Sequence, residues 1–153
     1  MTSGDRWALR LGTWFGCGRS PVAPGTAGTL GAIPLHLVLS RLPPALHWAL
    51  VGAISVLGIW SGERMVELLD DKDPQSAVID EVAGVLIALG IVRGRGLKSA
   101  VLATLLFRIL DITKPGPIDS AQHVKPAGLG VMADDLLAGI IAGLSVRFLS
   151  PRR

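Results

Sequence analysis

Long apolar runs, separated by short polar or proline- and glycine-containing breaks, fill most of the chain. Leu, Ala, Ile and Val occupy these runs without the alternation of period two that a half-buried strand shows. The pattern therefore predicts helices over residues 27–41, 45–70, 76–92, 97–112 and 132–149. The breaks between them are rich in Pro, Gly or Asp. The expected fold class is all-α, a compact helical bundle in which residues 1–153 form a single domain.

A glycine-rich segment over residues 11–29 precedes most of these runs, and we expect it to be an irregular loop. Loops of this kind, leading into a helix, can hold a phosphate group through backbone N–H groups. Turns also need glycine and proline, so the composition alone leaves both readings open. Thr26, Gly28 and Thr29 are the candidate phosphate-binding residues of this segment.

The apolar content raises the question of a membrane. Half of the residues are apolar, the mean hydropathy is +0.52, and 18% are charged, against about a quarter in ordinary soluble domains. A spanning helix needs roughly 20 apolar residues. Residues 43–62 are free of Asp, Glu, Lys and Arg for that long, whereas the runs over 82–92 and 136–146 each end at an arginine. The sequence leaves open a bundle bound to a membrane surface and a partly embedded protein.

Charge and cysteine content narrow the partners and the compartment. The net charge of +3 and the pI near 9.6 suit an anionic lipid surface or a phosphorylated substrate. We expect no nucleic-acid partner, because no stripe of Lys and Arg interleaved with aromatic residues occurs. The single cysteine, Cys17, fits a reducing compartment. Residues 1–15 lack the apolar core of a signal peptide, so we expect the protein on the cytoplasmic side.

Two acidic doublets, Asp80-Glu81 and Asp134-Asp135, each open an apolar run. Carboxylates are costly to bury unless they are paired or bind a metal. One doublet could simply cap a helix N-terminus. Two doublets brought together would repel each other without a cation, and hard oxygen ligands suit Mg²⁺. The sequence therefore predicts a Mg²⁺ site formed by Asp80, Glu81, Asp134 and Asp135.

The second doublet also marks a helix face of small residues. Asp135, Gly139 and Gly143 are spaced by four and share one face. We expect this face to press closely against another helix. Packing inside the chain and a homodimer interface would both satisfy this expectation.

A third charged group, Arg108, Asp111 and Lys114, recurs every three residues along one helix. A surface ion pair is the simplest explanation, but the surrounding residues are mostly apolar and leave little polar face for water. Arginine offers a planar fork for phosphate oxygens, and lysine offers a point charge. We therefore expect Arg108 and Lys114 to bind the phosphate group. For Asp111 three roles stay open: orienting Arg108, completing the metal site or acting as a base.

Taken together, four segments resemble the phosphatidylglycerophosphatase A family. They are residues 18–29, 79–84, 107–118 and 128–139, and they follow the order of the family's motifs. The resemblance covers most of the chain from about residue 12 to 145. Two departures are minor: Ala133 replaces a larger apolar residue, and a short N-terminal arm is present.

The resemblance implies an all-helical, Mg²⁺-dependent lipid phosphatase of phospholipid biosynthesis. The expected reaction converts phosphatidylglycerophosphate, an anionic phospholipid, into phosphatidylglycerol and phosphate. The enzyme is expected at the cytoplasmic membrane, with its active site facing the cytoplasm. By position, the catalytic residues are expected to be Asp80, Arg108, Asp111, Lys114 and Asp135.

Two other functions remain open at this point. One is a Mg²⁺-dependent phosphohydrolase that acts on a soluble phosphate ester, and the other is a non-enzymatic scaffold associated with the membrane. Within the phosphatase reading, the sequence does not distinguish one metal ion from two, or attack by water from an aspartyl-phosphate intermediate.

Overall fold

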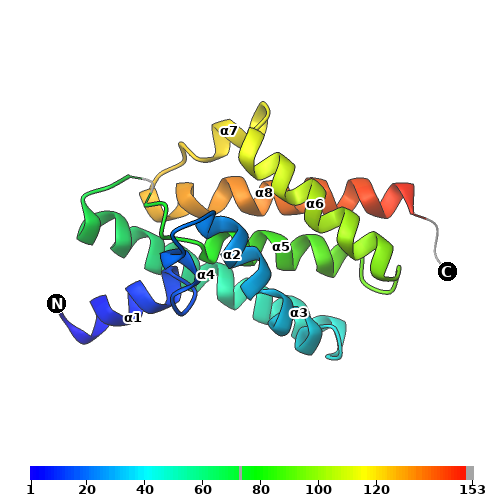
Figure 1. The fold of residues 1–153 in the computed structure, drawn as a ribbon, viewed down its shortest axis with the longest axis horizontal. Helices are drawn as coiled ribbons and strands as arrows, with labels where there is room; N and C mark the ends of the chain where they lie inside the picture. Colours follow the sequence, from blue (N-terminus) through cyan, green and yellow to red (C-terminus); the bar gives the residue numbers. More distant parts are fainter. Residues whose placement is uncertain (73, 151–153) are drawn as a thin grey trace.

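The computed structural model describes residues 1–72 and 74–150, and within these ranges the chain contains helices and no strand. This confirms the predicted all-α fold class. Figure 1 shows long helices lying side by side, with shorter helices at the edges of the bundle. In chain order the elements are α1 (Ser3–Gly12), η1 (Cys17–Arg19), α2 (Pro24–Gly31), α3 (Ile33–Leu39), α4 (Pro44–Leu69), α5 (Ile79–Ile91), α6 (Leu97–Thr113), α7 (Pro117–Ala121) and α8 (Ala127–Leu149).

The observed helices depart from the predicted ranges in three ways. The range 27–41 is two helices, α2 and α3, and Pro34 lies in the first turn of α3, where its missing N–H is tolerated. Helix α8 begins at Ala127, directly after Pro126, and is therefore longer than predicted. Helices α1 and α7 were not predicted.

The predicted irregular segment is also shorter than residues 11–29. Helix α1 extends to Gly12 and α2 begins at Pro24, so only the residues between them, which include η1, lie outside α-helices. Trp14, Phe15 and Ala23 have positive φ angles here. The Trp14 side chain donates a hydrogen bond to the Gly31 carbonyl at 3.0 Å, which fixes this segment against α2.

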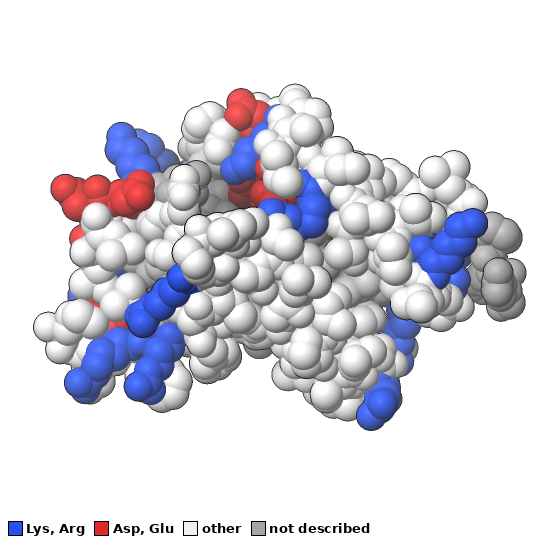
Figure 2. Space-filling view, in the orientation of Figure 1, with Lys and Arg blue, Asp and Glu red and all other residues white. Residues whose placement is uncertain are grey.

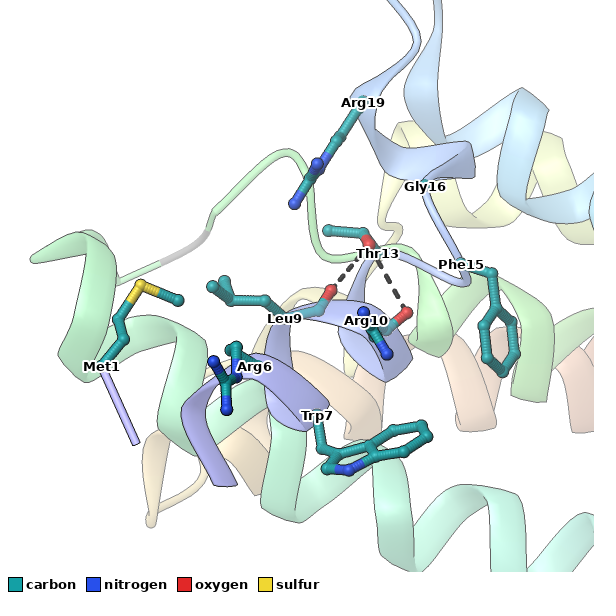
Figure 3. A pocket seen from close by; sticks show the side chains of 9 residues that line it. All are labelled: Met1, Arg6, Trp7, Leu9, Arg10, Thr13, Phe15, Gly16 and Arg19. Atoms are coloured by element: carbon teal, nitrogen blue, oxygen red, sulfur yellow. Dashed lines mark hydrogen bonds between the residues drawn. The ribbon is translucent and has the colours of Figure 1, made fainter. Parts of the chain in front are cut away.

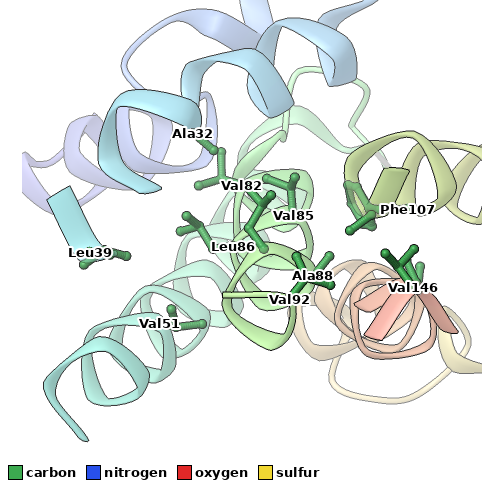
Figure 4. Packing of buried hydrophobic residues seen from close by; sticks show 14 of the residues in the cluster. Ala32, Leu39, Val51, Val82, Val85, Leu86, Ala88, Val92, Phe107 and Val146 are labelled. Carbon is green, nitrogen blue, oxygen red and sulfur yellow. The ribbon is translucent and has the colours of Figure 1, made fainter. Parts of the chain in front are cut away.

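Helix α5 lies at the centre of the bundle. It packs most extensively against α8 and also contacts α4, α6 and α2. Figure 4 shows Val82, Val85 and Leu86 of α5 between side chains contributed by the surrounding helices. Because α5 is buried on nearly every side, its sequence is apolar on nearly every face.

Glycines let α5 and α8 approach closely. A Cβ atom on Gly139 would lie 2.2 Å from the Gly84 carbonyl oxygen, and one on Gly143 would lie 2.9 Å from the Ile91 Cβ. This confirms that the face carrying Asp135, Gly139 and Gly143 presses against another helix. The partner is α5 of the same chain, so internal packing accounts for the small residues.

Large apolar side chains remain on the outside of the bundle. Val56 is 66% exposed and Phe148 is 84% exposed. Figure 2 shows a broad uncharged surface, with charged residues gathered toward the ends and in one central group. Helices α4 and α8 are long and apolar enough to cross a membrane by length and composition.

The N-terminal helix α1 is attached to the long helix α4 by a buried carboxylate. The Asp5 side chain accepts the Thr2 backbone N–H at 2.7 Å and thereby completes a capping box with Thr2. Arg64 of α4 donates to the same carboxylate through Nε at 3.0 Å and Nη2 at 2.7 Å. The backbone N–H of Thr2 and the guanidinium of Arg64 lower the pKa of Asp5 from 3.8 to about 2.

We predict that acid weakens this attachment. The pKa of Asp5 is lower in the folded protein than its ordinary value of 3.8. Asp5 therefore stabilises the fold at a pH above 3.8, and this stabilisation is lost as the pH falls toward about 2. The thermal unfolding midpoint of Asp5→Asn should therefore lie below that of the wild type at about pH 5, with the difference shrinking toward about pH 2. A difference independent of pH would contradict this account.

We also predict that Gly139→Ala destabilises the bundle by about 1–3 kcal/mol, because its Cβ would overlap the α5 backbone. Gly52→Ala in α4 is the matched control, since a Cβ there meets no atom within 4 Å. The control should keep or slightly raise stability, because alanine favours a helix over glycine. Chemical unfolding monitored by circular dichroism measures both. Equal stability of the two variants would show that the α5–α8 contact tolerates a wider spacing.

Candidate active site

The predicted charged residues come together where several helices begin or end. Asp80 and Glu81 lie in the first turn of α5, and Asp134 and Asp135 lie in the N-terminal half of α8. The trio Arg108, Asp111 and Lys114 lies at the C-terminal end of α6. The N-terminus of α2 lies against the same place through Gly25.

Three of the carboxylates form a compact group. One oxygen each of Asp80, Glu81 and Asp135 lies within 4.8 Å of the others. Two backbone contacts orient the doublets: Asp80 Oδ1 accepts the Glu81 N–H, and Asp134 Oδ1 accepts the Asp135 N–H, both at 3.0 Å. The close packing of α5 on α8 is what places Asp135 beside the α5 doublet.

Electrostatics make this group unfavourable when all its members are ionised. Burial, followed by the nearby charges of Glu81 and Asp135, raises the pKa of Asp80 well above its ordinary value. Burial also raises the pKa of Glu81, although the Arg108 guanidinium acts in the opposite direction. A divalent cation among these oxygens would reverse the repulsion and favour the ionised forms.

Unpartnered atoms test whether a metal ion fits here. Glu81 Oε2 and Asp135 Oδ2 are buried and have no hydrogen-bond partner in the described part of the chain. Buried acceptors in native proteins nearly always have a partner. Carboxylate oxygens are also the ligands that Mg²⁺ prefers. The residues present therefore fit a hard divalent cation.

The basic side chain of Arg108 lies against the carboxylates. Arg108 Nη1 donates to Asp111 Oδ2 and lies 3.8 Å from Glu81 Oε1. The Arg108 Nε is buried and has no hydrogen-bond partner among the described residues. Asp111 thus holds one side of the Arg108 guanidinium and leaves another donor of that group near the carboxylates. Its role in the reaction stays a prediction.

Asp134 differs from the other three carboxylates. Its Oδ2 forms an ion pair with Lys114 Nζ, which also donates to Gln122 Oε1 at 3.4 Å. Asp134 is absent from the close group of Asp80, Glu81 and Asp135. The structure thus brings Asp134 to the edge of the site as the partner of Lys114, and its role as a metal ligand stays a prediction.

Gly25, at the N-terminus of α2, contacts the site but was not among the predicted site residues. A Cβ on Gly25 would lie 2.2 Å from Glu81 Oε1 and 3.0 Å from Arg108 Nη2, so only a glycine fits without displacing them. The residue at the N-cap of α2 is Ala23, which supplies no side-chain hydrogen bond to the first turn of the helix. Gly25 was visible in the glycine-rich segment, but only its spatial neighbours distinguish it from the other glycines.

The three candidate phosphate-binding residues of α2 have different surroundings. Thr26 is exposed. A Cβ on Gly28 would lie 2.7 Å from the Val78 side chain, and Thr29 is buried with its hydroxyl donating to the Gly25 carbonyl at 3.0 Å. Gly28 and Thr29 thus pack α2 against its neighbours, and their contact with phosphate stays a prediction.

A cavity of about 720 Å³ adjoins the site at Asp134. Its walls come from the C-terminal part of α4, from Lys72, from the segment between α7 and α8, and from the N-terminal half of α8. Its charged lining residues are Glu63, Lys72, Lys125 and Asp134, so the lining carries both signs. Of the predicted site residues, the lining includes Asp134.

The sequence matches one known protein family and several named proteins. Residues 10–150 match the family described as Phosphatidylglycerophosphatase A. The chain is 34% identical over 147 residues to Phosphatidylglycerophosphatase A of Escherichia coli, covering 94% of this chain and 83% of that protein. It is 34% identical over 137 residues to the protein of the same name from Haemophilus influenzae, covering 89% and 84%.

A protein from Bacteroides thetaiotaomicron named putative phosphatidylinositol-3-phosphatase is 42% identical over 137 residues, which cover 85% of each chain. No solved structure matches the chain significantly. The helical fold and these relatives define the class of the protein, which is a phosphatase. The chain belongs to the phosphatidylglycerophosphatase A family. Its two long apolar helices and its relatives favour association with a membrane.

We predict that Gly25→Ala impairs catalysis more than folding. The added methyl group would displace the Glu81 carboxylate or the Arg108 guanidinium, and displacements of about 1 Å at an active site can cost a hundredfold in rate. Phosphate release and circular dichroism should be measured together on Gly25→Ala and on Gly52→Ala. Equal activity of the two variants would argue against a catalytic group at the α2 N-terminus.

Proposed function

We propose that the protein is a Mg²⁺-dependent phosphatase that hydrolyses phosphatidylglycerophosphate to phosphatidylglycerol and phosphate, as a step of phospholipid biosynthesis. The observation that carries this proposal is the convergence of Asp80, Glu81 and Asp135 next to Arg108, with buried acceptors on Glu81 and Asp135 that lack partners among the described residues. The relatives named for this activity supply the substrate.

Asp80, Glu81 and Asp135 would hold the metal ion. A Mg²⁺ ion bound there supplies a Lewis acid that polarises the phosphate and lowers the pKa of a bound water. The three carboxylates come from two rigid helices that are packed backbone to backbone. Their positions are therefore set by the fold before any ligand arrives, which lowers the cost of organising the site during the reaction.

The basic side chains would bind the phosphoryl group. Arg108 presents its fork to two phosphate oxygens while Asp111 holds one of its Nη atoms in place. Lys114 neutralises further charge on the transferring group, and Asp134 fixes its ammonium at the edge of the site. The N-terminus of α2, directly beside Glu81 and Arg108, adds the positive end of a helix dipole.

We also propose that the enzyme works at the cytoplasmic membrane, with the site facing the cytoplasm. The exposed apolar side chains of α4, α6 and α8 would contact lipid. The charged group lies at the α5 N-terminal and α6 C-terminal ends, near the middle of the molecule's length in Figure 1. A phospholipid could then present its polar head to the site while its acyl chains remain beside the apolar helices.

The relative from Bacteroides thetaiotaomicron supports a second candidate substrate. Its name refers to a phosphatidylinositol phosphate, and it shares a larger fraction of identical residues with this chain than the two proteins named phosphatidylglycerophosphatase A. Both substrates are phosphomonoesters on a membrane lipid, so the same carboxylate and arginine chemistry serves either. The difference lies in the polar group that carries the phosphate.

The assay that tests the proposal measures phosphate release in detergent–lipid mixed micelles. Phosphatidylglycerophosphate, phosphatidylinositol 3-phosphate and glycerol 3-phosphate serve as parallel substrates, each with Mg²⁺ and with EDTA. We expect fastest release from phosphatidylglycerophosphate, loss of release with EDTA, and recovery with excess Mg²⁺. Preference for glycerol 3-phosphate would favour a soluble-ester phosphohydrolase, and no release from any substrate would contradict the proposal.

Variants of the acidic group test the proposed ligands. Asp80→Asn and Asp135→Asn should lower the rate of phosphate release by at least about a hundredfold, because each removes a charged ligand from the proposed metal site. Asp70→Asn is the matched control, since Asp70 is exposed at the end of α4 and its left-handed backbone accepts asparagine. Full activity in either site variant would refute the ligand assignment.

A further inference from the structure

A separate groove lies along α1 and η1, and none of its lining residues belongs to the site described above. Its volume is about 540 Å³. Figure 3 shows Arg6, Trp7 and Arg10 from α1, Phe15 from the following turn, and Arg19 from η1 around it. The groove combines residues of the N-terminal arm, which precede the family match over 10–150, with residues at the start of that match.

The charge of this groove is one-sided. Three arginines line it, and no Asp or Glu is among the described residues of its wall. The one carboxylate of α1, Asp5, is buried and bound by Arg64 of α4, so it does not neutralise the groove. Arginines gathered around a concave surface without carboxylates complement an anionic group such as a phosphate.

Exposed aromatic residues accompany the arginines. Trp7 is 52% exposed and Phe15 is 67% exposed. The Arg10 guanidinium carbon lies 5.5 Å from the centroid of the Trp7 ring, within the range of a cation–π contact. Tryptophan beside basic residues is typical of the boundary between lipid and water, where the ring meets the acyl region and the charge meets the headgroups. The mixture therefore favours a phospholipid over a soluble anion.

The position of α1 agrees with a place at a lipid surface. Helix α1 packs against α4, one of the two helices long and apolar enough to cross a membrane. The Gly12 carbonyl at the end of α1 accepts a hydrogen bond from the Val78 N–H at 2.8 Å, directly before the α5 doublet. The groove is thus attached to the same end of α5 as the acidic group.

We propose that the α1–η1 groove binds the headgroup of an anionic phospholipid, as a second lipid site separate from the one that holds the substrate phosphate. Arg6, Arg10 and Arg19 contact the lipid phosphate, and Trp7 and Phe15 contact the adjoining glycerol and upper acyl region. The site would hold the N-terminal arm at the membrane surface, near the N-terminal end of α5 that carries the acidic group.

Tryptophan quenching tests the proposal without depending on catalysis. The full-length protein is placed in micelles of a neutral detergent, and phosphatidylserine or phosphatidylcholine with brominated acyl chains is added in increasing fraction. Phosphatidylserine is anionic but is not the substrate or product of the proposed reaction. The signal of Trp7 is the difference between the wild type and Trp7→Phe. We expect half-maximal quenching of this signal at a roughly tenfold lower fraction of phosphatidylserine than of phosphatidylcholine.

Paired charge variants locate the effect. Arg6→Gln/Arg10→Gln should raise the required fraction of phosphatidylserine about tenfold, whereas Arg41→Gln/Lys98→Gln, which removes two exposed charges elsewhere, should leave it unchanged. Arg19→Gln lies outside α1 and should give a smaller rise in the required fraction of phosphatidylserine. It replaces the double variant as the test if circular dichroism shows that the double variant has lost helix content. Equal quenching by the two lipids in the wild type, or an equal effect of both double variants, would overturn the proposal.

Discussion

The close contact between α5 and α8 positions both the hydrophobic core and the acidic group. Gly84 and Gly139 let the two backbones touch, and a side chain at Gly139 would collide with the α5 carbonyl at 2.2 Å. Since Asp135 lies one turn before Gly139 on the same helix face, this contact also fixes Asp135 beside Asp80 and Glu81. The packing of α5 on α8 therefore forms part of the hydrophobic core and also brings the three carboxylates together.

The same packing holds an unfavourable set of charges in place. Burial and mutual repulsion raise the pKa of Asp80, and the opposing charges available in the fold are Arg108 near Glu81 and Lys114 on Asp134. Such clusters persist where the surrounding structure is stable enough to tolerate them, and they are typical of functional sites. A bound cation would relieve this repulsion, so the protein should be more stable with the cation bound than without it.

The sequence predicted the features that depend on local pattern. The helices corresponding to α4 and α6, the acidic doublets and the small-residue face through Gly139 all follow from periodicity and spacing. Features that depend on contacts far apart in sequence could not be predicted. Helix α1 is attached through Asp5 to Arg64, Lys114 of α6 pairs with Asp134 of α8, and the position of Gly25 against Glu81 appears only when α2 meets α5.

Direct metal binding tests most sharply whether the acidic group holds a divalent cation. Mn²⁺, which shares the oxygen preference of Mg²⁺ and is visible by electron paramagnetic resonance, should be titrated into the full-length wild type and Asp135→Asn without substrate. The wild type should bind Mn²⁺ saturably, and excess Mg²⁺ should displace it. Binding should be strongly weakened in the variant. Equal Mn²⁺ binding by both proteins, or none by the wild type, would contradict it.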